Sequence, residues 1–295
     1  MLVSVVIRTF NEERHLDELL SAVSKQISSQ FDIETVIIDS GSTDSTLSIA
    51  KKYGARITHI KKEEFTFGRS LNMGCDFANG DYLVFISGHC IPIENDWLDQ
   101  LCQPLIDGIS DYSYGRQIGR DTTKYSEEQI FNKYFPEQNK TPQVGFFCNN
   151  ANSAVTRKSW LKFKFDEKLT GLEDMYLAKQ IVESGGTVSY KADAPVYHIH
   201  DETWHRIKIR YEREAIALHK IMPEVQFHFY DYVYCVLRSI FSDLKRAFKE
   251  QKLKQHFRSI IMFRNMQYWG AYTGHREYRK HTTLIKQKYF YPSIR

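Results

Sequence analysis

The segment DYLVFISGHCIP, residues 81–92, changes abruptly from an apolar run to polar turn residues. Residues 82–86 form an uninterrupted apolar and aromatic stretch, which is typical of a strand buried on both faces of a parallel sheet. Ser87, Gly88 and His89 follow directly. Ligands bind at the carboxyl ends of strands in open α/β sheets, so we predict that these three residues lie on the floor of a site. Turn chemistry alone is an equal alternative, because Ser and Gly favour turns.

The composition indicates one large folded domain or a core domain with an appendage. The chain has 295 residues, of which 42% are hydrophobic, enough for a sizeable core. Its five cysteines are scattered and include no C-x-x-C pair, so we expect neither a disulfide framework nor a zinc knuckle, and a reducing cytosol fits. The longest charge-free hydrophobic stretch is too short to cross a bilayer, and the start lacks a basic segment. We therefore expect no transmembrane helix, no signal peptide and a cytoplasmic protein.

The net charge of +4 conceals an asymmetry between the two ends of the chain. Residues 204–295 contain 19 Lys and Arg against 7 Asp and Glu, a net charge of +12, whereas residues 1–203 carry −8. We predict a catalytic domain over residues 1–203 and a basic, aromatic-rich helical extension over residues 204–295. Such an extension suits phosphate, an anionic membrane surface or nucleic acid. A solvated basic helical face is the commoner explanation for any one helix.

Apolar periodicity gives an alternating order of strands and helices in the first half of the chain. That order, at the period of a βαβ unit, predicts a parallel sheet with helices on both faces. The expected strands and extended segments are 3–7, 33–38, 55–60, 82–86, 110–117, 146–155, 187–190 and 194–198. The later expected helices are 96–106, 126–134, 171–184, 206–219 and 233–248.

Polar residues also follow the first two strands. Thr9 and Asn11 end the first strand, and Asp39 ends the second. A carboxylate at this place can accept a hydrogen bond from the imide N–H of uracil or thymine, or from a ribose hydroxyl, so Asp39 is a candidate nucleoside-binding residue. A helix cap is the alternative for Asp39. Neither G-x-G-x-x-G nor a P-loop follows the first strand.

Five segments, taken in order, resemble glycosyltransferase family 2, which has the GT-A fold. They are VVIRTFNEE at 5–13, IIDSGSTDST at 37–46, GRSLNMG at 68–74, SGH at 87–89 and GLED at 171–174. The pattern is most similar to bacterial members that build surface polysaccharides, some of them called rhamnosyltransferases. The resemblance implies an α/β fold with a mostly parallel central sheet flanked by helices, followed here by a C-terminal helical extension.

The resemblance implies an inverting transfer of a sugar from a UDP- or dTDP-sugar to a hydroxyl of a growing capsule, O-antigen or exopolysaccharide. Such a transfer needs a base for the hydroxyl proton and positive charge for the leaving diphosphate. The base of the family is an acidic residue at the start of a helix. Asp174 matches this position, with Glu173 as the second candidate. Acids that only satisfy the helix dipole are the alternative.

The chain departs from the family at the metal-binding D-x-D motif. Ser87-Gly88-His89 stands at this place. His89 together with His198 or His200, which would share a face of an extended segment, could hold Mn²⁺ or Mg²⁺. Basic residues that replace the metal are an equal alternative, and hydrogen-bonded histidines at a sheet edge are the alternative for the later pair.

The resemblance also places donor and acceptor groups. Asn side chains beside an apolar pair could hydrogen-bond sugar hydroxyls, although an Asn-rich turn is the alternative. Two arginines at helical spacing could close over the diphosphate as a lid. The donor-binding candidates are Thr9, Asn11, Glu12, Asp39, Ser42, Arg69, Ser87 and Gly88; the sugar or acceptor candidates are Arg116, Asn149, Asn150 and Asn152; the lid candidates are Arg210 and Arg213.

The expected partners are a nucleotide-diphospho-sugar and a saccharide acceptor, for which a lipid-linked saccharide is a candidate, with no nucleic acid. The extension would contact the anionic inner face of the cell membrane or form a homo-oligomer. The Q-x-x-R-W signature of processive synthases is absent, which favours single addition. Two alternatives are a degenerate sugar-nucleotide-binding protein, suggested by the missing D-x-D, and a sugar nucleotidyltransferase, whose Gly- and Lys-rich triphosphate loop we do not find.

Overall fold

The computed structural model describes residues 1–277 and Tyr289. The chain divides into two compact units. The first comprises residues 1–120, 134–168 and 173–199, and the second comprises residues 121–133, 169–172 and the described part of 200–295. The domain boundary at residue 203 stays a prediction. Residues 278–288 and 290–295 of the predicted extension lie outside the described residues.

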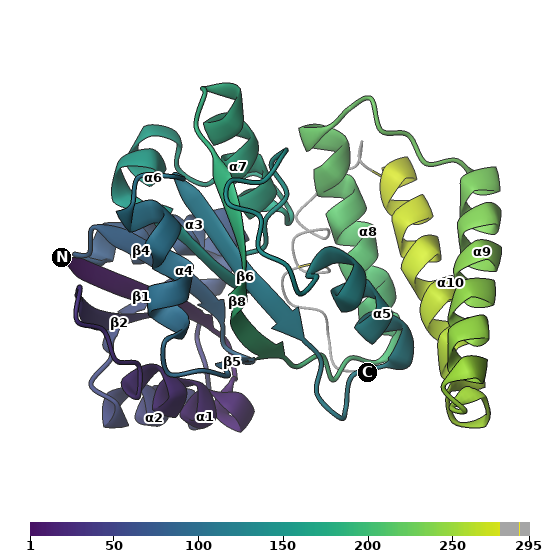
Figure 1. The fold of residues 1–295 in the computed structure, drawn as a ribbon, viewed down its shortest axis with the longest axis horizontal. Helices are drawn as coiled ribbons and strands as arrows, with labels where there is room; N and C mark the ends of the chain where they lie inside the picture. Colours follow the sequence, from purple (N-terminus) through teal and green to yellow (C-terminus); the bar gives the residue numbers. More distant parts are fainter. Residues whose placement is uncertain (278–288, 290–295) are drawn as a thin grey trace. The chain divides into compact units, whose positions relative to one another are not determined.

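The first unit is built on one eight-stranded sheet, with the strand order β3-β2-β1-β4-β7-β6-β8-β5. Figure 1 shows its strands as arrows with helices packed around them. The strands are β1 (Leu2–Thr9), β2 (Asp32–Asp39), β3 (Arg56–His59), β4 (Tyr82–Ser87), β5 (Cys90–Pro92), β6 (Tyr112–Ile118), β7 (Asn152–Thr156) and β8 (Val188–His198).

The first four strands are parallel, and their carboxyl ends are aligned. Thr9 pairs with Asp39 across β1 and β2, and Arg8 pairs with Ser87 across β1 and β4. β7 runs antiparallel to both β4 and β6, β8 runs parallel to β6, and β5 runs antiparallel to β8. The predicted mostly parallel sheet is confirmed. The polar ends of β1, β2 and β4 therefore lie together at one edge of the sheet. This is the edge at which ligands bind in open α/β sheets.

Helices cover both faces of the sheet, because alternate side chains of each strand point to opposite sides. The core on one face joins Val5 and Ile7 of β1 to Leu16 of α1 and Trp97 of α4. On the other face, a Cβ at Gly74 of α3 would lie 2.3 Å from Ile38 Cδ1, so only glycine permits this approach. The helices of this unit are α1 (Glu13–Ser24), α2 (Thr46–Lys52), α3 (Phe67–Phe77), α4 (Trp97–Ile106), α6 (Arg157–Phe163) and α7 (Glu173–Glu183), with a 3₁₀ turn, η1, at Lys62–Glu64.

The far end of the sheet is irregular. Only two residues separate β4 from β5 in the sequence. In the sheet, however, β5 lies at the far edge in eighth place and pairs with β8 in seventh place. β8 is bulged against β6, since Gly115 pairs with Lys191 but Gln117 pairs with Val196. Between these two pairs, β8 has three residues more than β6. This irregularity brings the end of β8 beside the residues that follow β4.

The second unit is helical. Its helices are α5 (Tyr125–Tyr134), α8 (Trp204–Ile221), α9 (Phe229–Lys249) and α10 (Leu253–Glu277), with the last residue of α5 assigned to the first unit. A Cβ at Gly270 of α10 would lie 2.3 Å from the Lys208 carbonyl oxygen of α8, so the two helices pack closely. Arg264 of α10 forms a buried ion pair with Asp243 of α9 at 2.8 Å. Within the described residues, no helix combines the length and apolarity needed to cross a membrane.

Candidate active site

The carboxylate of Asp39 organises the turn after β2. Its Oδ1 accepts hydrogen bonds from Thr9 Oγ1 (3.0 Å) and Ser42 Oγ (2.5 Å), and its Oδ2 accepts from the backbone N–H groups of Gly41 and Ser42, both at 2.9 Å. Asp39 is 1% exposed. Burial of a carboxylate is tolerated here because four donors satisfy it. Its contact with a nucleoside stays a prediction, and the structure adds a role in shaping this turn.

Asn11 and Glu12 connect this turn to the end of β4. Asn11 has a positive φ of 56°, and its side chain accepts a hydrogen bond from the Thr43 N–H at 2.9 Å. Glu12 Oε1 lies 3.5 Å from His89 Nδ1. A Cβ at Gly88 would lie 2.8 Å from Glu12 Cγ, so a larger residue at position 88 would displace the Glu12 side chain. The predicted donor-binding residues at the ends of β1, β2 and β4 are thus brought together.

Asp174 and Glu173 lie in the first turn of α7, and both are buried. Asp174 Oδ2 accepts from the Asn150 N–H and its Oδ1 from the Met175 N–H, each at 2.7 Å. Glu173 Oε1 lies 3.2 Å from Arg8 Nη1, in an ion pair at the end of β1. The two carboxylates therefore have different environments, because Glu173 has a cationic partner and Asp174 has backbone donors.

These environments set the protonation of Asp174. Burial raises the pKa of Asp174, and the neighbouring Glu173 carboxylate raises it further, to about 7. The two backbone N–H groups and Arg8 act in the opposite direction but do not overcome burial. A carboxylate with a pKa near neutral pH can accept a proton and is then a stronger base than an ordinary aspartate. Of the two predicted candidates, Asp174 has the environment of a general base.

The asparagines after residue 148 are largely structural. Asn152 is fully buried; its Oδ1 accepts from Trp97 Nε1 at 2.9 Å, and its Nδ2 donates to the carbonyls of Arg116 (3.1 Å) and Ala194 (2.8 Å). All of its polar atoms are occupied, which corrects the prediction that Asn152 binds sugar. Asn150 Oδ1 accepts from Ser153 Oγ, whereas its buried Nδ2 has no hydrogen-bond partner among the described residues. Asn150 therefore retains a donor for a ligand.

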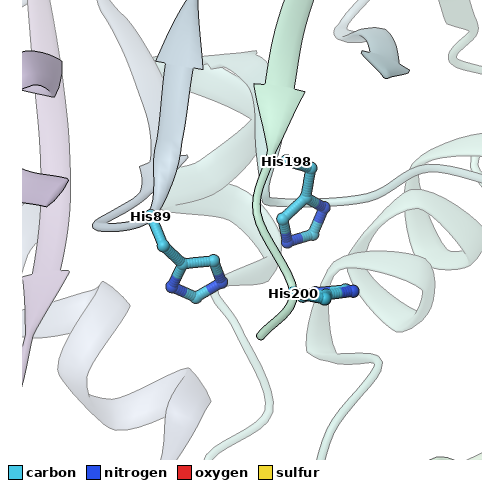
Figure 2. A group of neighbouring side chains, drawn as sticks. All are labelled: His89, His198 and His200. Carbon is cyan, nitrogen blue, oxygen red and sulfur yellow. The ribbon is translucent and has the colours of Figure 1, made fainter. Parts of the chain in front are cut away.

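His89 and His198 form a stacked pair, although 108 positions of the chain separate them. Their ring centroids lie 5.3 Å apart, and Figure 2 shows the two side chains at the ends of neighbouring segments. Cys90, which follows His89, is the β5 partner of His198 in β8. The β5–β8 ladder therefore brings the pair together. His200, also labelled in Figure 2, follows His198 by two residues and is the first residue of the last chain segment of the second unit.

A hydrogen-bond chain fixes the orientation of the His198 ring. Gln117 Nε2 donates to Asn149 Oδ1 at 3.0 Å, so Gln117 Oε1 is left to accept from His198 Nδ1 at 2.7 Å. The proton then resides on Nδ1, and Nε2 carries the lone pair, which is the arrangement of metal-binding histidines. Ring nitrogens of His89 and His198 lie within 4.8 Å of one another. These two residues fit a divalent cation, and Asn149 belongs to their support.

Two of the predicted basic residues lie at the surface of the first unit. Arg69 is exposed on α3, with its Nε 3.7 Å from Glu167 Oε2. Arg116 Nη2 lies 2.8 Å from Glu137 Oε1. Arg69 follows Gly68 in the predicted GRSLNMG motif, and Asn72 of that motif is buried and hydrogen-bonds both backbone polar groups of Phe165. The motif thus fixes α3, and with it Arg69.

In the second unit, Arg210 lies between two carboxylates. Its Nη2 is 2.5 Å from Glu127 Oε1 and 2.9 Å from Glu202 Oε2, and His200 Nδ1 is 2.6 Å from the same Glu127 oxygen. Burial alone would raise the pKa of Glu127, but Arg210 and His200 overcome it and lower the pKa to about 2. To act as a lid, Arg210 would have to break its ion pairs with Glu127 and Glu202 and bind the diphosphate instead. Arg213 lies beside Gly171, whose added Cβ would be 3.4 Å from Arg213 Nε.

Three residues of these networks were not predicted. Arg8 shares the strand end of Thr9, and that position could have identified it. Gln117 and Glu127 belong to no motif, and only the three-dimensional structure brings them beside histidines.

Comparisons with known proteins identify the family and the fold of this chain. The sequence model described as glycosyl transferase family 2 matches residues 4–163. The chain belongs to glycosyl transferase family 2. This family 2 member is 24% identical over 242 residues to the O-antigen chain rhamnosyltransferase RfbN of Salmonella typhimurium, covering 78% of this chain and 76% of RfbN. The predicted rhamnosyltransferase-like family assignment is confirmed.

Two solved structures share the fold of this family 2 chain. The mannosyltransferase PcManGT from Pyrobaculum calidifontis, in complex with GDP-Man and Mn²⁺, superposes with a TM-score of 0.66 at 16% identity, covering 91% of this chain and 85% of PcManGT. A fragment of TarS from S. aureus, in complex with UDP-GlcNAc, has a TM-score of 0.52 at 16% identity, covering 95% of this chain and 92% of the fragment. The predicted GT-A fold with a helical C-terminal region is confirmed.

Proposed function

We propose that this protein transfers a hexosyl or deoxyhexosyl group, with inversion, from a UDP- or dTDP-sugar to a hydroxyl of a growing O-antigen, capsule or exopolysaccharide. Membership of family 2 supports sugar transfer. The similarity to RfbN, named an O-antigen chain rhamnosyltransferase, supports a surface polysaccharide and a deoxyhexosyl donor. The observation on which the proposal depends is the buried Asp174, whose pKa is raised to about 7.

In the proposed reaction, Asp174 takes the proton of the acceptor hydroxyl while the hydroxyl oxygen attacks the anomeric carbon. The bond from that carbon to the diphosphate oxygen breaks, and the nucleoside diphosphate leaves with the bonding electron pair. Glu173 lies next to the base in the sequence, and Arg8 is its ion-pair partner at 3.2 Å. Asn150 contributes its backbone N–H to the orientation of Asp174 and a free amide donor to the acceptor or sugar.

A divalent cation would stabilise the negative charge of the leaving diphosphate. We propose His89 and His198 as its ligands, with His200 as the third, because the hydrogen bond to Gln117 places the proton of His198 on Nδ1 and the lone pair on Nε2. Mn²⁺ accepts imidazole together with oxygen ligands, so Mn²⁺ suits this set better than Mg²⁺.

The donor would bind along the aligned ends of β1, β2 and β4. The turn that Asp39 holds would carry the nucleoside, and exposed Arg69 would supply positive charge for the base or phosphates. Arg116 stays a proposed acceptor residue, and Arg210 and Arg213 stay proposed diphosphate residues. The remaining residues proposed for the donor are Thr9, Asn11, Glu12, Ser42, Ser87 and Gly88.

A screen of nucleotide sugars tests this function. Thermal shift with UDP-, dTDP- and GDP-sugars, each with and without Mn²⁺, would identify the donor, because a ligand that binds the folded state raises the melting temperature. Turnover of the stabilising donor would then be measured for the wild type and for Asp174→Asn. Equally low turnover in both proteins would contradict catalysis and support a degenerate binding protein. Diphosphate release from a nucleoside triphosphate and a sugar phosphate would instead indicate a nucleotidyltransferase.

A further inference from the structure

Helix α9 exposes a row of large apolar side chains. The row consists of Tyr230, Tyr234, Leu237, Phe241 and Phe248, which are 59–71% exposed, and we call it the α9 stripe. Its spacings of four, three, four and seven residues place all five side chains within about 60° of one another at 100° per residue. A soluble surface rarely presents a continuous apolar stripe without a partner.

The opposite side of α9 determines that the α9 stripe faces outward. Val236, Asp243 and Ala247 are buried. Asp243 is fixed by Arg264 of α10 at 2.8 Å and accepts a hydrogen bond from Ser126 Oγ of α5 at 2.7 Å. A rotation of α9 that buried the stripe would break this buried ion pair, at a cost of several kcal/mol. The stripe is therefore a fixed outer surface of the helical unit.

The exposed charges of α9 beside the stripe are basic. Arg238, Lys245 and Lys249 are exposed, and their spacings of seven and four residues place them along one flank of the stripe. The two acidic residues of α9 are not available to compensate them. Asp231 caps the helix by accepting from the His228 N–H at 2.8 Å, and Asp243 is buried in its ion pair.

This charge pattern distinguishes between two possible partners. The spacing of the stripe would also suit a helix of a second copy, but paired helices place opposite charges at the flanking positions, and α9 exposes only basic groups there. An anionic bilayer supplies the missing negative charge. Tyrosine rings and basic side chains with long apolar stems are also the residue types enriched at the interface of membrane and water.

We propose that the α9 stripe docks on the surface of an anionic lipid bilayer. The helix, about 31 Å long at 1.5 Å per residue, lies in the plane of the membrane. Its apolar and aromatic side chains enter the boundary between headgroups and acyl chains, and Arg238, Lys245 and Lys249 contact lipid phosphates. The inference goes beyond sugar transfer and does not depend on it, but docking would bring the enzyme to a lipid-linked acceptor.

Vesicle sedimentation of the full chain tests the proposal. We expect binding to vesicles of phosphatidylglycerol and phosphatidylcholine, and binding weaker by at least tenfold to phosphatidylcholine alone. Each basic residue near an anionic surface contributes about fivefold to partitioning, so the triple variant Arg238→Gln/Lys245→Gln/Lys249→Gln should bind about a hundredfold more weakly. The variant Phe241→Ser/Phe248→Ser should bind at least about tenfold more weakly, because buried phenylalanine contributes at least that factor.

Matched variants in the first unit control for general charge and apolarity. Lys51→Gln/Lys158→Gln/Lys168→Gln removes three exposed lysines, and Leu161→Gln removes an exposed leucine. Both should bind vesicles as the wild type does. The proposal would be overturned if the triple lysine control lost as much vesicle affinity as the triple variant Arg238→Gln/Lys245→Gln/Lys249→Gln. It would also be overturned if Phe241→Ser/Phe248→Ser bound vesicles as strongly as the wild type. Vesicle binding unaffected by the α9 variants, together with a dimer that they dissociate in sedimentation equilibrium, would assign the stripe to a second copy. Sugar transfer from a nucleotide sugar is measured in a separate assay without vesicles. A chain without transferase activity can therefore be distinguished from a chain that does not bind membranes.

Discussion

Replacing Asp174 by Asn should change how stability depends on pH, as well as lower the rate of sugar transfer. The folded pKa of Asp174 is about 7, whereas an ordinary aspartate has a pKa of 3.8. Between these two pH values the folded state holds a proton that the unfolded chain has lost, so stability falls as pH rises through this window. From pH 5 to pH 7 this amounts to two pH units at 1.36 kcal/mol each, about 3 kcal/mol.

Asn at this position cannot titrate, and it alters the local hydrogen bonds. One carboxylate oxygen is replaced by an amide N–H₂, which leaves the N–H of Asn150 or Met175 without its acceptor. That loss should cost about 1–3 kcal/mol at every pH. We therefore expect Asp174→Asn to be less stable than the wild type at pH 5 and of equal or greater stability at pH 8. The difference in unfolding free energy should move by about 3 kcal/mol in favour of Asn over this range.

The measurement is urea unfolding of both proteins at pH 5, 6, 7 and 8, with sugar transfer assayed on the same samples. The loss of a general base should lower the transfer rate by about 10²- to 10⁴-fold. Wild-type activity should rise with pH through about 7, because only the ionised Asp174 accepts a proton. The control is Asp76→Asn, which removes an exposed carboxylate of α3 that lies 3.4 Å from Lys164 Nζ.

Two results would refute this reasoning. A difference in unfolding free energy that is the same at all four pH values would mean that Asp174 is ionised in the folded chain throughout. Retained transfer by Asp174→Asn would mean that another group takes the hydroxyl proton.

The other networks give two further expectations. Gln117→Leu should weaken Mn²⁺ binding by about ten- to a hundredfold, because His198 loses the acceptor for its Nδ1–H. Calorimetry with Mn²⁺ and nucleotide measures the affinity, with Gln100→Leu as the control. Binding heats of Gln117→Leu equal to those of the wild type and of the control would contradict the expectation. Glu127→Gln should lower the free energy of unfolding by about 3 kcal/mol, since its arginine partner stays buried with less compensation. Urea unfolding against the exposed control Glu128→Gln measures the loss, and a common midpoint for both variants would exclude it.

The sheet was predictable because its strands obey local rules. The run at 82–86 is continuously apolar since β4 is central and buried on both faces, and the observed strand covers Tyr82–Ser87. β5 and α6 were not predicted. Residues 90–92 are too short for a periodic signal, and pairing with β8 determines their conformation. The segments expected at 187–190 and 194–198 form one bulged strand, β8, because pairing with β6 continues on both sides of the bulge.

The site was predictable where a residue follows a strand or begins a helix. Asp39, His89 and Asp174 were proposed for this reason, and the structure places each of them at such a position, although their roles stay predictions. Asn152 was misassigned because an amide offers the same donors and acceptors to a sugar as to a protein interior, and only burial distinguishes the two. Gln117 could not be found from its neighbours in sequence, because its partners His198 and Asn149 come from other segments of the chain.

The two-residue connection between β4 and β5 sets a limit on the shape of the sheet. Four steps across a flat sheet, from β4 to β5, would span about 19 Å. The Cα atoms of Ser87 and Cys90 can be at most about 11 Å apart. The carboxyl edge must therefore curl into a partly closed rim, for which the bulge of β8 supplies the additional chain. The two-residue connection between β4 and β5 therefore limits how far this edge of the sheet can flatten. Two glycines inserted into this connection would relax that limit without replacing any of the candidate site residues.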